Sequence, residues 1–277
     1  MLKISTHNHV TRFDLARSIA GRGRYWTTAY LIDGLLVDSG CAHCAHELLQ
    51  ALDRCKTLSC IINTHSHEDH IGTNGPLQSR NAGLEVLAHP LAIPILGSPR
   101  ERQRLQPYRR FFWGYPESSI ARSVGNSEHI ETDDFSFRVI YTPGHSSDHL
   151  CLYEPSEAWL FSGDLFAGGR DRALRGDYDI WQIIASLKLI ADLPIKWLFP
   201  GCARAREDPK GDLKSKIAYL EELGESVMDL HWKGWASNSI VRELCGEPML
   251  IEFVTCGHFS RRHLVHSYIR NSPSEAS

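Results

Sequence analysis

The segment "NTHSHEDHIG", residues 63–72, places three histidines and two carboxylates in six consecutive positions. His65 and His67 lie two positions apart soon after the apolar strand "CIIN", and Asp69 and His70 follow where we expect the chain to turn. Imidazole and carboxylate are preferred zinc ligands when thiolates are few, and a catalytic site needs about three protein ligands plus an open position for water. The chain has 15 histidines, so chance clusters in solvated loops occur, but the full H-x-H-x-D-H spacing after a strand predicts a metal site.

The elements that must position this segment alternate between strands and helices. Apolar stretches rich in β-branched and aromatic residues predict strands at 25–32, 35–40, 58–64, 84–90, 135–142, 149–155, 158–164 and 195–201. Helical spacing of apolar residues predicts helices at 41–55 and 179–193, the second beginning at Asp179. This interleaving predicts an α/β or α+β class with layered packing.

Two further regions depart from the strand and helix alternation. Residues 97–127 are rich in proline, arginine and aromatics without a clear period, which is typical of a lid or binding loop inserted into a compact domain. From residue 209 the pattern is mostly helical. We therefore expect a core at 1–208 with a lid insertion, and a C-terminal helical region at 209–277 packed on that core.

Three more motifs extend the pattern of the histidine segment. They are "TPGHSSDH" with His145, "FSGD" with Asp164, and "LFPG" directly before Cys202. Together with the H-x-H-x-D-H loop, their order resembles that of the metallo-β-lactamase superfamily over about residues 25–205. The resemblance implies an αββα sandwich with metals at one edge between its two sheets. Its glyoxalase II-like, lactonase-like and RNA-cleaving branches are the most similar.

The same resemblance implies roles for individual side chains. His65, His67 and His145 would hold a first ion, Asp69 and His70 a second, and Asp164 would bridge the two. Zinc is the expected metal, one ion or two, with iron or manganese as alternatives. Two ions can share a hydroxide and lower its pKa to about 7, and Asp69 can also orient that hydroxide and accept a proton.

One position departs from the superfamily pattern. The histidine expected after "LFPG" is replaced by Cys202. A thiolate is a good zinc ligand, so Cys202 is a candidate for the second ion; a small packing residue is the alternative. The substitution leaves the occupancy of the second site open.

Composition excludes several classes of protein and partner. A net charge of −3 and a pI near 6.6 disfavour nucleic acid as a partner without excluding it. The N-terminus lacks the apolar segment of a signal peptide, and no stretch approaches the roughly 18 apolar residues of a membrane helix. Eight cysteines in a chain of 277 residues are expected as thiols. We expect a cytoplasmic protein without membrane contact, acting on a small molecule; its oligomeric state stays open, a homodimer included.

These features favour a zinc-dependent, binuclear hydrolase that uses a metal-bound hydroxide to cleave a thioester, ester or lactone. The first alternative is a phosphodiesterase or ribonuclease of the same fold, and the second is a regulatory member with weak or no catalysis, suggested only by Cys202. Candidate substrate-binding residues are Tyr108, Arg109 and Arg110 in the lid and His258 near the C-terminus. Packing of the lid aromatics on the edge of the sandwich is the alternative role for the lid.

Overall fold

The structure, a computed structural model, describes residues 1–55 and 58–272, which form two compact units. The first unit contains Met1–Tyr141, Asp148–Ala167 and Ile195–Glu207. The second contains Thr142–Ser147, Gly168–Pro194 and the described residues from Asp208 onward. The last junction lies one residue from the boundary expected at 208/209. Two earlier segments, which the sequence pattern assigned to the core, belong to the second unit.

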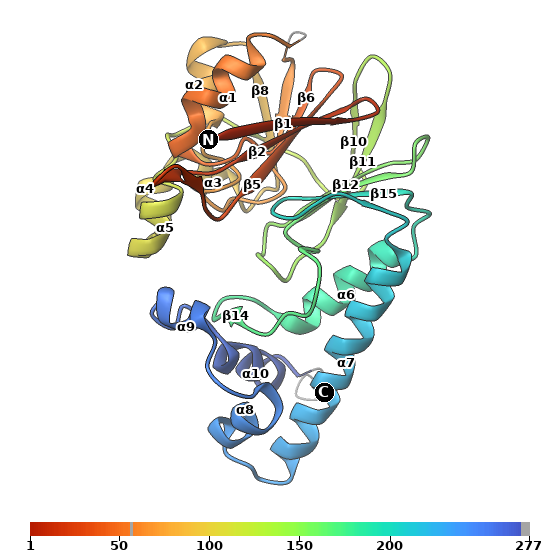
Figure 1. The fold of residues 1–277 in the computed structure, drawn as a ribbon. Helices are drawn as coiled ribbons and strands as arrows, with labels where there is room; N and C mark the ends of the chain where they lie inside the picture. Colours follow the sequence, from red (N-terminus) through yellow and green to blue (C-terminus); the bar gives the residue numbers. More distant parts are fainter. Residues whose placement is uncertain (56–57, 273–277) are drawn as a thin grey trace. The chain divides into compact units, whose positions relative to one another are not determined.

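The first unit contains a seven-stranded sheet in the order β1-β2-β5-β6-β7-β8-β9 (Figure 1). Strands β1 to β6 pair antiparallel, whereas β6, β7, β8 and β9 run parallel. The strands are β1 (Leu2–His7), β2 (Val10–Leu15), β5 (Thr27–Ile32), β6 (Leu35–Val37), β7 (Cys60–Ile62), β8 (Glu85–Ala88) and β9 (Arg122–Ser123). The four strands predicted here, β5 to β8, are confirmed, and the hairpin β1–β2 was not predicted.

A second sheet of six strands completes the sandwich of the first unit. Its order is β10-β11-β12-β13-β15-β16, antiparallel except for the parallel pair β13 and β15. The strands are β10 (His129–Glu131), β11 (Ser136–Tyr141), β12 (Leu150–Glu154), β13 (Trp159–Gly163), β15 (Trp197–Pro200) and β16 (Arg206–Glu207). A short separate hairpin consists of β3 (Ser18–Ile19) and β4 (Arg22–Gly23).

The two sheets pack face to face through a buried aromatic core. Tyr30 of β5 contacts Phe161 of β13 and Phe199 of β15, with ring centroids 5.4 and 5.5 Å apart. The Tyr30 hydroxyl donates to the carbonyl of Pro200 at 2.6 Å, which satisfies its one buried polar atom. These contacts hold β15 against β5, and the backbone nitrogen of Thr28, near the start of β5, donates to the carbonyl of Gly201 directly after β15. Strand ends of both sheets therefore meet at one edge.

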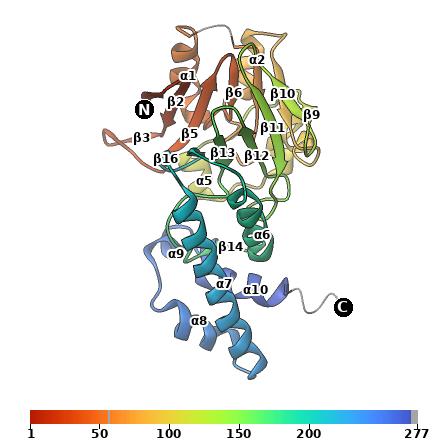
Figure 2. The ribbon, with the colours of Figure 1, turned by 90° about the vertical axis from the view of Figure 1, so that its right-hand side faces the viewer.

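Helices cover the other face of the first sheet (Figure 2). Leu48 of α1, Leu77 of α2 and Leu96 of α3 are buried in one apolar cluster with side chains of β2, β5 and β7. The helices of this unit are η1 (Ala42–Cys44), α1 (Ala45–Leu52), α2 (Asn74–Arg80), α3 (Ile93–Gly97), α4 (Pro99–Arg102) and α5 (Pro107–Phe112). The expected irregular insertion thus contains short helices, because Pro99 and Pro107 each begin one.

The second unit is mainly helical. Its elements are β14 (Leu174–Arg175), α6 (Ile180–Ala191), α7 (Lys210–Trp232), α8 (Ser237–Cys245), α9 (Leu250–Val254), β17 (Phe259–Ser260) and α10 (Arg261–Arg270). Asp179 caps α6 by accepting from the backbone nitrogens of Trp181 and Gln182, which confirms the predicted start. Within the described ranges, no helix combines the length and the apolar character that crossing a membrane requires.

Candidate metal centre

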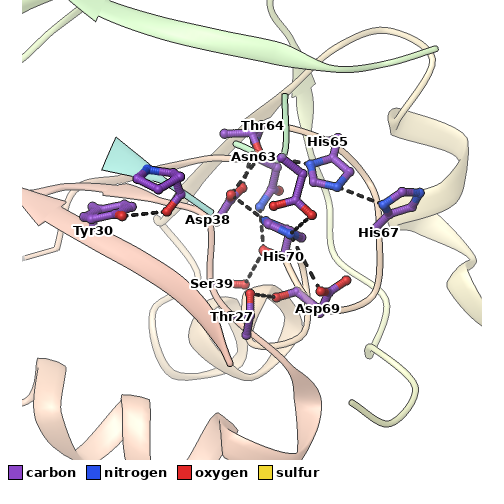
Figure 3. Close-up of polar contacts among 12 residues, drawn as sticks. Thr27, Tyr30, Asp38, Ser39, Asn63, Thr64, His65, His67, Asp69 and His70 are labelled. Carbon is purple, nitrogen blue, oxygen red and sulfur yellow. Dashed lines mark hydrogen bonds and ion pairs between the residues drawn. The ribbon is translucent and has the colours of Figure 1, made fainter. Parts of the chain in front are cut away.

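The predicted histidines lie together in the loop that follows β7 (Figure 3). His65 and His70 are fully buried, with ring centroids 4.1 Å apart, and His67 is 9% exposed. The Nε2 atom of His65 lies 2.9 Å from the Nδ1 atom of His67. The chain therefore brings three imidazoles together at the edge where strands of both sheets end.

Two carboxylates lie close to His70. The Nε2 atom of His70 lies 3.5 Å from a carboxylate oxygen of Asp164 and 3.8 Å from one of Asp69. Asp164 follows directly after β13, so the second sheet contributes it to the loop of the first sheet. His65, His70 and Asp164 each offer one ligand atom, and these three atoms lie within 4.8 Å of one another. This spacing is short enough for the three residues to bind one cation or two neighbouring cations.

The charges in this cluster also fit a divalent cation. Burial lowers the pKa of His70, but Asp164, Asp38 and Asp69 around it raise that pKa well above the ordinary value. Burial raises the pKa of Asp69, and the negative charge of Asp164 raises it further. The buried Nε2 atom of His70 has no hydrogen-bond partner among the described residues. A metal ion would bind this nitrogen and neutralise the carboxylates.

Two glycines allow the strand ends to approach the cluster. A Cβ atom on Gly201 would lie 2.7 Å from the Cε1 atom of His70 and 2.8 Å from a carboxylate oxygen of Asp164. A Cβ atom on Gly163 would lie 2.6 Å from the Nε2 atom of His149, and its backbone φ of +48° disfavours other residues. The glycines of "FSGD" and "LFPG" therefore give the backbone room beside the ligands.

Asp38, which the sequence analysis did not select, orients His70. It follows β6 and accepts hydrogen bonds from the backbone nitrogen and the hydroxyl of Thr64, at 2.7 and 2.8 Å (Figure 3). Its other contact is the Nδ1 atom of His70 at 2.7 Å. An Nδ1–H that donates to Asp38 leaves the lone pair on Nε2, where a metal would bind. The feature of the sequence that could have indicated this role is a carboxylate near the end of the predicted strand 35–40.

Replacing Asp38 with asparagine is expected to weaken metal binding by about 10- to 100-fold, because the carboxylate no longer fixes the ring and the basicity of His70. Competition with a chromogenic chelator measures the affinity. Asp53→Asn, at an exposed position after α1, is the matched control. Equal metal affinity of Asp38→Asn and the wild type would contradict this role for Asp38.

Two adjacent residues of "TPGHSSDH" also support the loop. A carboxylate oxygen of Asp148 accepts from the backbone nitrogen of Ser66 at 2.9 Å. The backbone nitrogen of Asp164 donates to the Nε2 atom of His149 at 3.2 Å. Burial lowers the pKa of His149 to about 4, so its ring is neutral near pH 7 and serves as an acceptor. Neither residue was predicted, because His145 alone was assigned in this motif.

The lid insertion contacts the metal loop through buried polar side chains. Arg109 of α5 forms a two-pronged ion pair with Glu68, which is fully buried, and Arg109 itself is only 7% exposed. The side-chain amide of Gln103 donates to the carbonyl of Ser66. Arg109 was predicted to bind substrate, whereas in the structure its guanidinium lies in an internal ion pair.

The remaining candidates lie in different parts of the chain. Arg110 is exposed on α5 and Tyr108 is half-buried, while Cys202 is exposed directly after Gly201. His145 and His258 belong to the second unit. The Nε2 atom of His145 lies 3.3 Å from the hydroxyl of Tyr178 within that unit. The roles of these five residues at the site stay predictions.

Comparisons with curated proteins find hydroxyacylglutathione hydrolases. The protein of Rhizobium meliloti (strain 1021) is 30% identical over 148 residues, covering 52% of this chain and 49% of its own length. That of Serratia proteamaculans (strain 568) is 28% identical over 217 residues, covering 73% and 74%. For the first relatives, the match spans about half of their length.

Among solved structures, a metallo-beta-lactamase family protein from Thermus thermophilus has a TM-score of 0.65 at 18% identity, covering 95% of this chain and 93% of its own. TTHA1623, solved in a di-iron-bound form, has a TM-score of 0.57 at 28% identity, covering 71% and 96%. The first likeness shows the fold, and it agrees with the expected α/β sandwich. The profile of the metallo-beta-lactamase superfamily matches residues 24–202, more than half of the 277 residues. The chain belongs to the metallo-beta-lactamase superfamily.

Proposed function

We propose that this protein is a metal-dependent hydrolase that cleaves a thioester, ester or lactone. The observation that carries the proposal is the cluster of the buried His65 and His70 with the half-buried Asp164, whose ligand atoms lie within 4.8 Å and whose surroundings favour a cation. The relatives named hydroxyacylglutathione hydrolase support an acyl substrate on a thiol. Zinc is the proposed metal, and the di-iron-bound form of TTHA1623 keeps iron as an alternative.

The residues would share the chemistry as follows. His65, His67 and His145 would hold one ion, Asp69 and His70 a second, and Asp164 would bridge the two. When bound, divalent ions lower the pKa of water and polarise an acyl carbonyl. The Asp69 carboxylate, whose pKa burial raises, is a proton acceptor for the attacking water. The hydroxyl of Thr27 donates to the backbone carbonyl of Asp69 at 2.7 Å and holds that residue in place (Figure 3).

A substrate panel tests this proposal on protein of known metal content. We expect turnover of an acyl thioester or a lactone that a chelator abolishes and added zinc restores, with iron and manganese compared in parallel. Turnover of bis-p-nitrophenyl phosphate alone would favour the phosphodiesterase alternative. Metal-loaded protein that turns over none of the three substrates would favour the regulatory alternative.

Cys202 is the proposed last ligand of the second ion. The backbone of Gly201 is fixed beside the site, because its nitrogen donates to Gly163 and its carbonyl accepts from Thr28, both at 2.7 Å. Cys202 directly follows Gly201 and therefore occupies the position at which the superfamily pattern places a histidine. A zinc–sulfur bond of about 2.3 Å would replace a zinc–nitrogen bond of about 2.0–2.1 Å.

We expect Cys202→Ala to lower the affinity for the second ion and the turnover rate, and Cys202→His to restore or raise both. Metal stoichiometry and steady-state rates measure the two effects. Cys256→Ala, at an exposed cysteine of the second unit, is the control. Wild-type metal content and turnover in Cys202→Ala would assign the thiol to packing.

A further inference from the structure

The lid insertion differs in charge from the rest of the chain. Residues 97–115 contain five arginines and a single acidic residue, Glu101, although the whole chain carries a net charge of −3. A solvated positive face is the ordinary explanation for such a cluster. Several of these arginines are sequence neighbours of residues that contact the metal loop, which argues for a more specific role.

Two side chains anchor this insertion to the metal loop. Gln103 donates to the carbonyl of Ser66, between the ligand candidates His65 and His67. Arg109 pairs with Glu68, which directly precedes Asp69. The anchors are buried or half-buried polar contacts, so the insertion has a defined place beside the candidate metal centre.

Three exposed arginines flank these anchors, and we call Arg102, Arg104 and Arg110 the arginine face. Arg102 and Arg104 lie on either side of Gln103, and Arg110 follows Arg109. Neighbouring Cα atoms are about 3.8 Å apart. Each of these three arginines therefore has its Cα atom that close to the Cα atom of a residue that contacts the metal loop. Among the described residues, none forms an ion pair with these three side chains.

Exposed aromatic rings lie next to the arginine face. Phe111 directly follows Arg110 and is 48% exposed. The guanidinium carbon of Arg17 lies over its ring, 4.5 Å from the ring centroid. Tyr25 is 42% exposed and packs on Phe112 with ring centroids 4.3 Å apart. Arginines bind phosphates through paired hydrogen bonds, and aromatic rings and guanidinium groups stack on nucleobases.

We propose that the arginine face binds the phosphates of a nucleotide-bearing thiol, so that the substrate is an acyl thioester of the coenzyme A type. The neighbouring rings of Tyr25 and Phe111 receive the base. This assignment rests on the proposed hydrolase function and narrows its substrate class. A nucleic acid carries the same phosphate chemistry, but the net negative charge of the chain opposes binding along an extended polyanion.

The test compares the same acyl group on coenzyme A and on pantetheine, which lacks the nucleotide. For the wild type, we expect kcat/KM to be at least about tenfold higher with the coenzyme A thioester, because charge-assisted hydrogen bonds to phosphate are strong. In the triple variant Arg102→Ala, Arg104→Ala, Arg110→Ala this ratio should fall close to one, mainly through KM.

A matched triple variant controls for the loss of positive charge. Arg54, Arg80 and Arg122 are exposed arginines elsewhere in the first unit, and their replacement with alanine should preserve the preference for coenzyme A. If both triple variants lose the preference for the coenzyme A thioester equally, the net charge of the protein explains the preference, and the assignment is wrong. Equal kcat/KM of the wild type for the two thioesters would overturn it as well.

Direct binding separates this inference from the proposed function. Calorimetry with metal-loaded protein should show that free coenzyme A binds at least about tenfold more tightly than pantetheine, and that the arginine-face variant loses this difference. This result stands even if no thioester, ester or lactone is hydrolysed, and such a failure would refute the hydrolase function alone. Tighter binding of a short single-stranded RNA than of coenzyme A, lost in the same variant, would overturn the thioester assignment in favour of nucleic acid.

Discussion

His67→Ala is expected to lower kcat/KM by at least about a hundredfold and to reduce the bound metal, because metal activation of water contributes several kcal/mol to catalysis. His67 is the most exposed of the three clustered imidazoles, at 9%, and its Nδ1 atom lies 2.9 Å from His65. Its removal leaves the neighbouring imidazole in place. The loss should therefore come from a missing ligand rather than from a collapsed loop.

Metal content and rate have to be measured on the same preparations of this variant. His46→Ala is the control, because His46 is exposed on α1 and lies outside the cluster. Thermal unfolding without metal should agree within a few degrees among the wild type and both variants. Undiminished turnover in metal-quantified His67→Ala protein would refute the site assignment as a whole.

The metal loop itself could be predicted from sequence because its ligand types lie within six consecutive residues. His65, His67, Asp69 and His70 need only a strand end and a turn to come together, and both are local. Asp164 was found through the "FSGD" motif at the end of another strand. Its approach to His70, at 3.5 Å, confirms that the two sheets meet at one edge.

The supporting residues could not be predicted in the same way. Asp38 lies 32 positions before His70, and only the parallel pairing of β6 with β7 brings the two strand ends together. The pair of Glu68 and Arg109 joins residues 41 positions apart across an insertion without a clear period. Both contacts depend on tertiary packing between distant parts of the chain, and the residue types and their spacing within a short segment do not predict such contacts.

Strands that are buried throughout were predictable, whereas the largely exposed β1 was not. β5, β12 and β13 are buried throughout and appear as continuous apolar stretches. β1 is largely exposed, with a mixed sequence, and its pairing with β2 fixes its conformation instead. Because most of its side chains are polar, β1 was not predicted as a strand.

Arg109→Ala is expected to destabilise the protein by about 3–5 kcal/mol, because it leaves a buried carboxylate without its partner. Glu68 is fully buried, and the Nε atom of Arg109 donates to it at 2.6 Å. Denaturant unfolding measures the free energy. Arg110→Ala, at the exposed neighbouring position, should change it by less than about 0.5 kcal/mol.

The double variant Glu68→Gln, Arg109→Met distinguishes a lost ion pair from a lost anchor. Without a buried charge, it should recover a large part of the stability that Arg109→Ala loses. Burial raises the pKa of Glu68, and the guanidinium opposes this effect. Without the guanidinium, the pKa of Glu68 should rise above the value of about 7 that it has in the wild type, so the deficit of Arg109→Ala relative to the wild type should grow as the pH rises above 7 and shrink as the pH falls toward 7. A deficit that is independent of pH, or a double variant as unstable as Arg109→Ala, would show that Arg109 supports the metal loop through packing rather than charge.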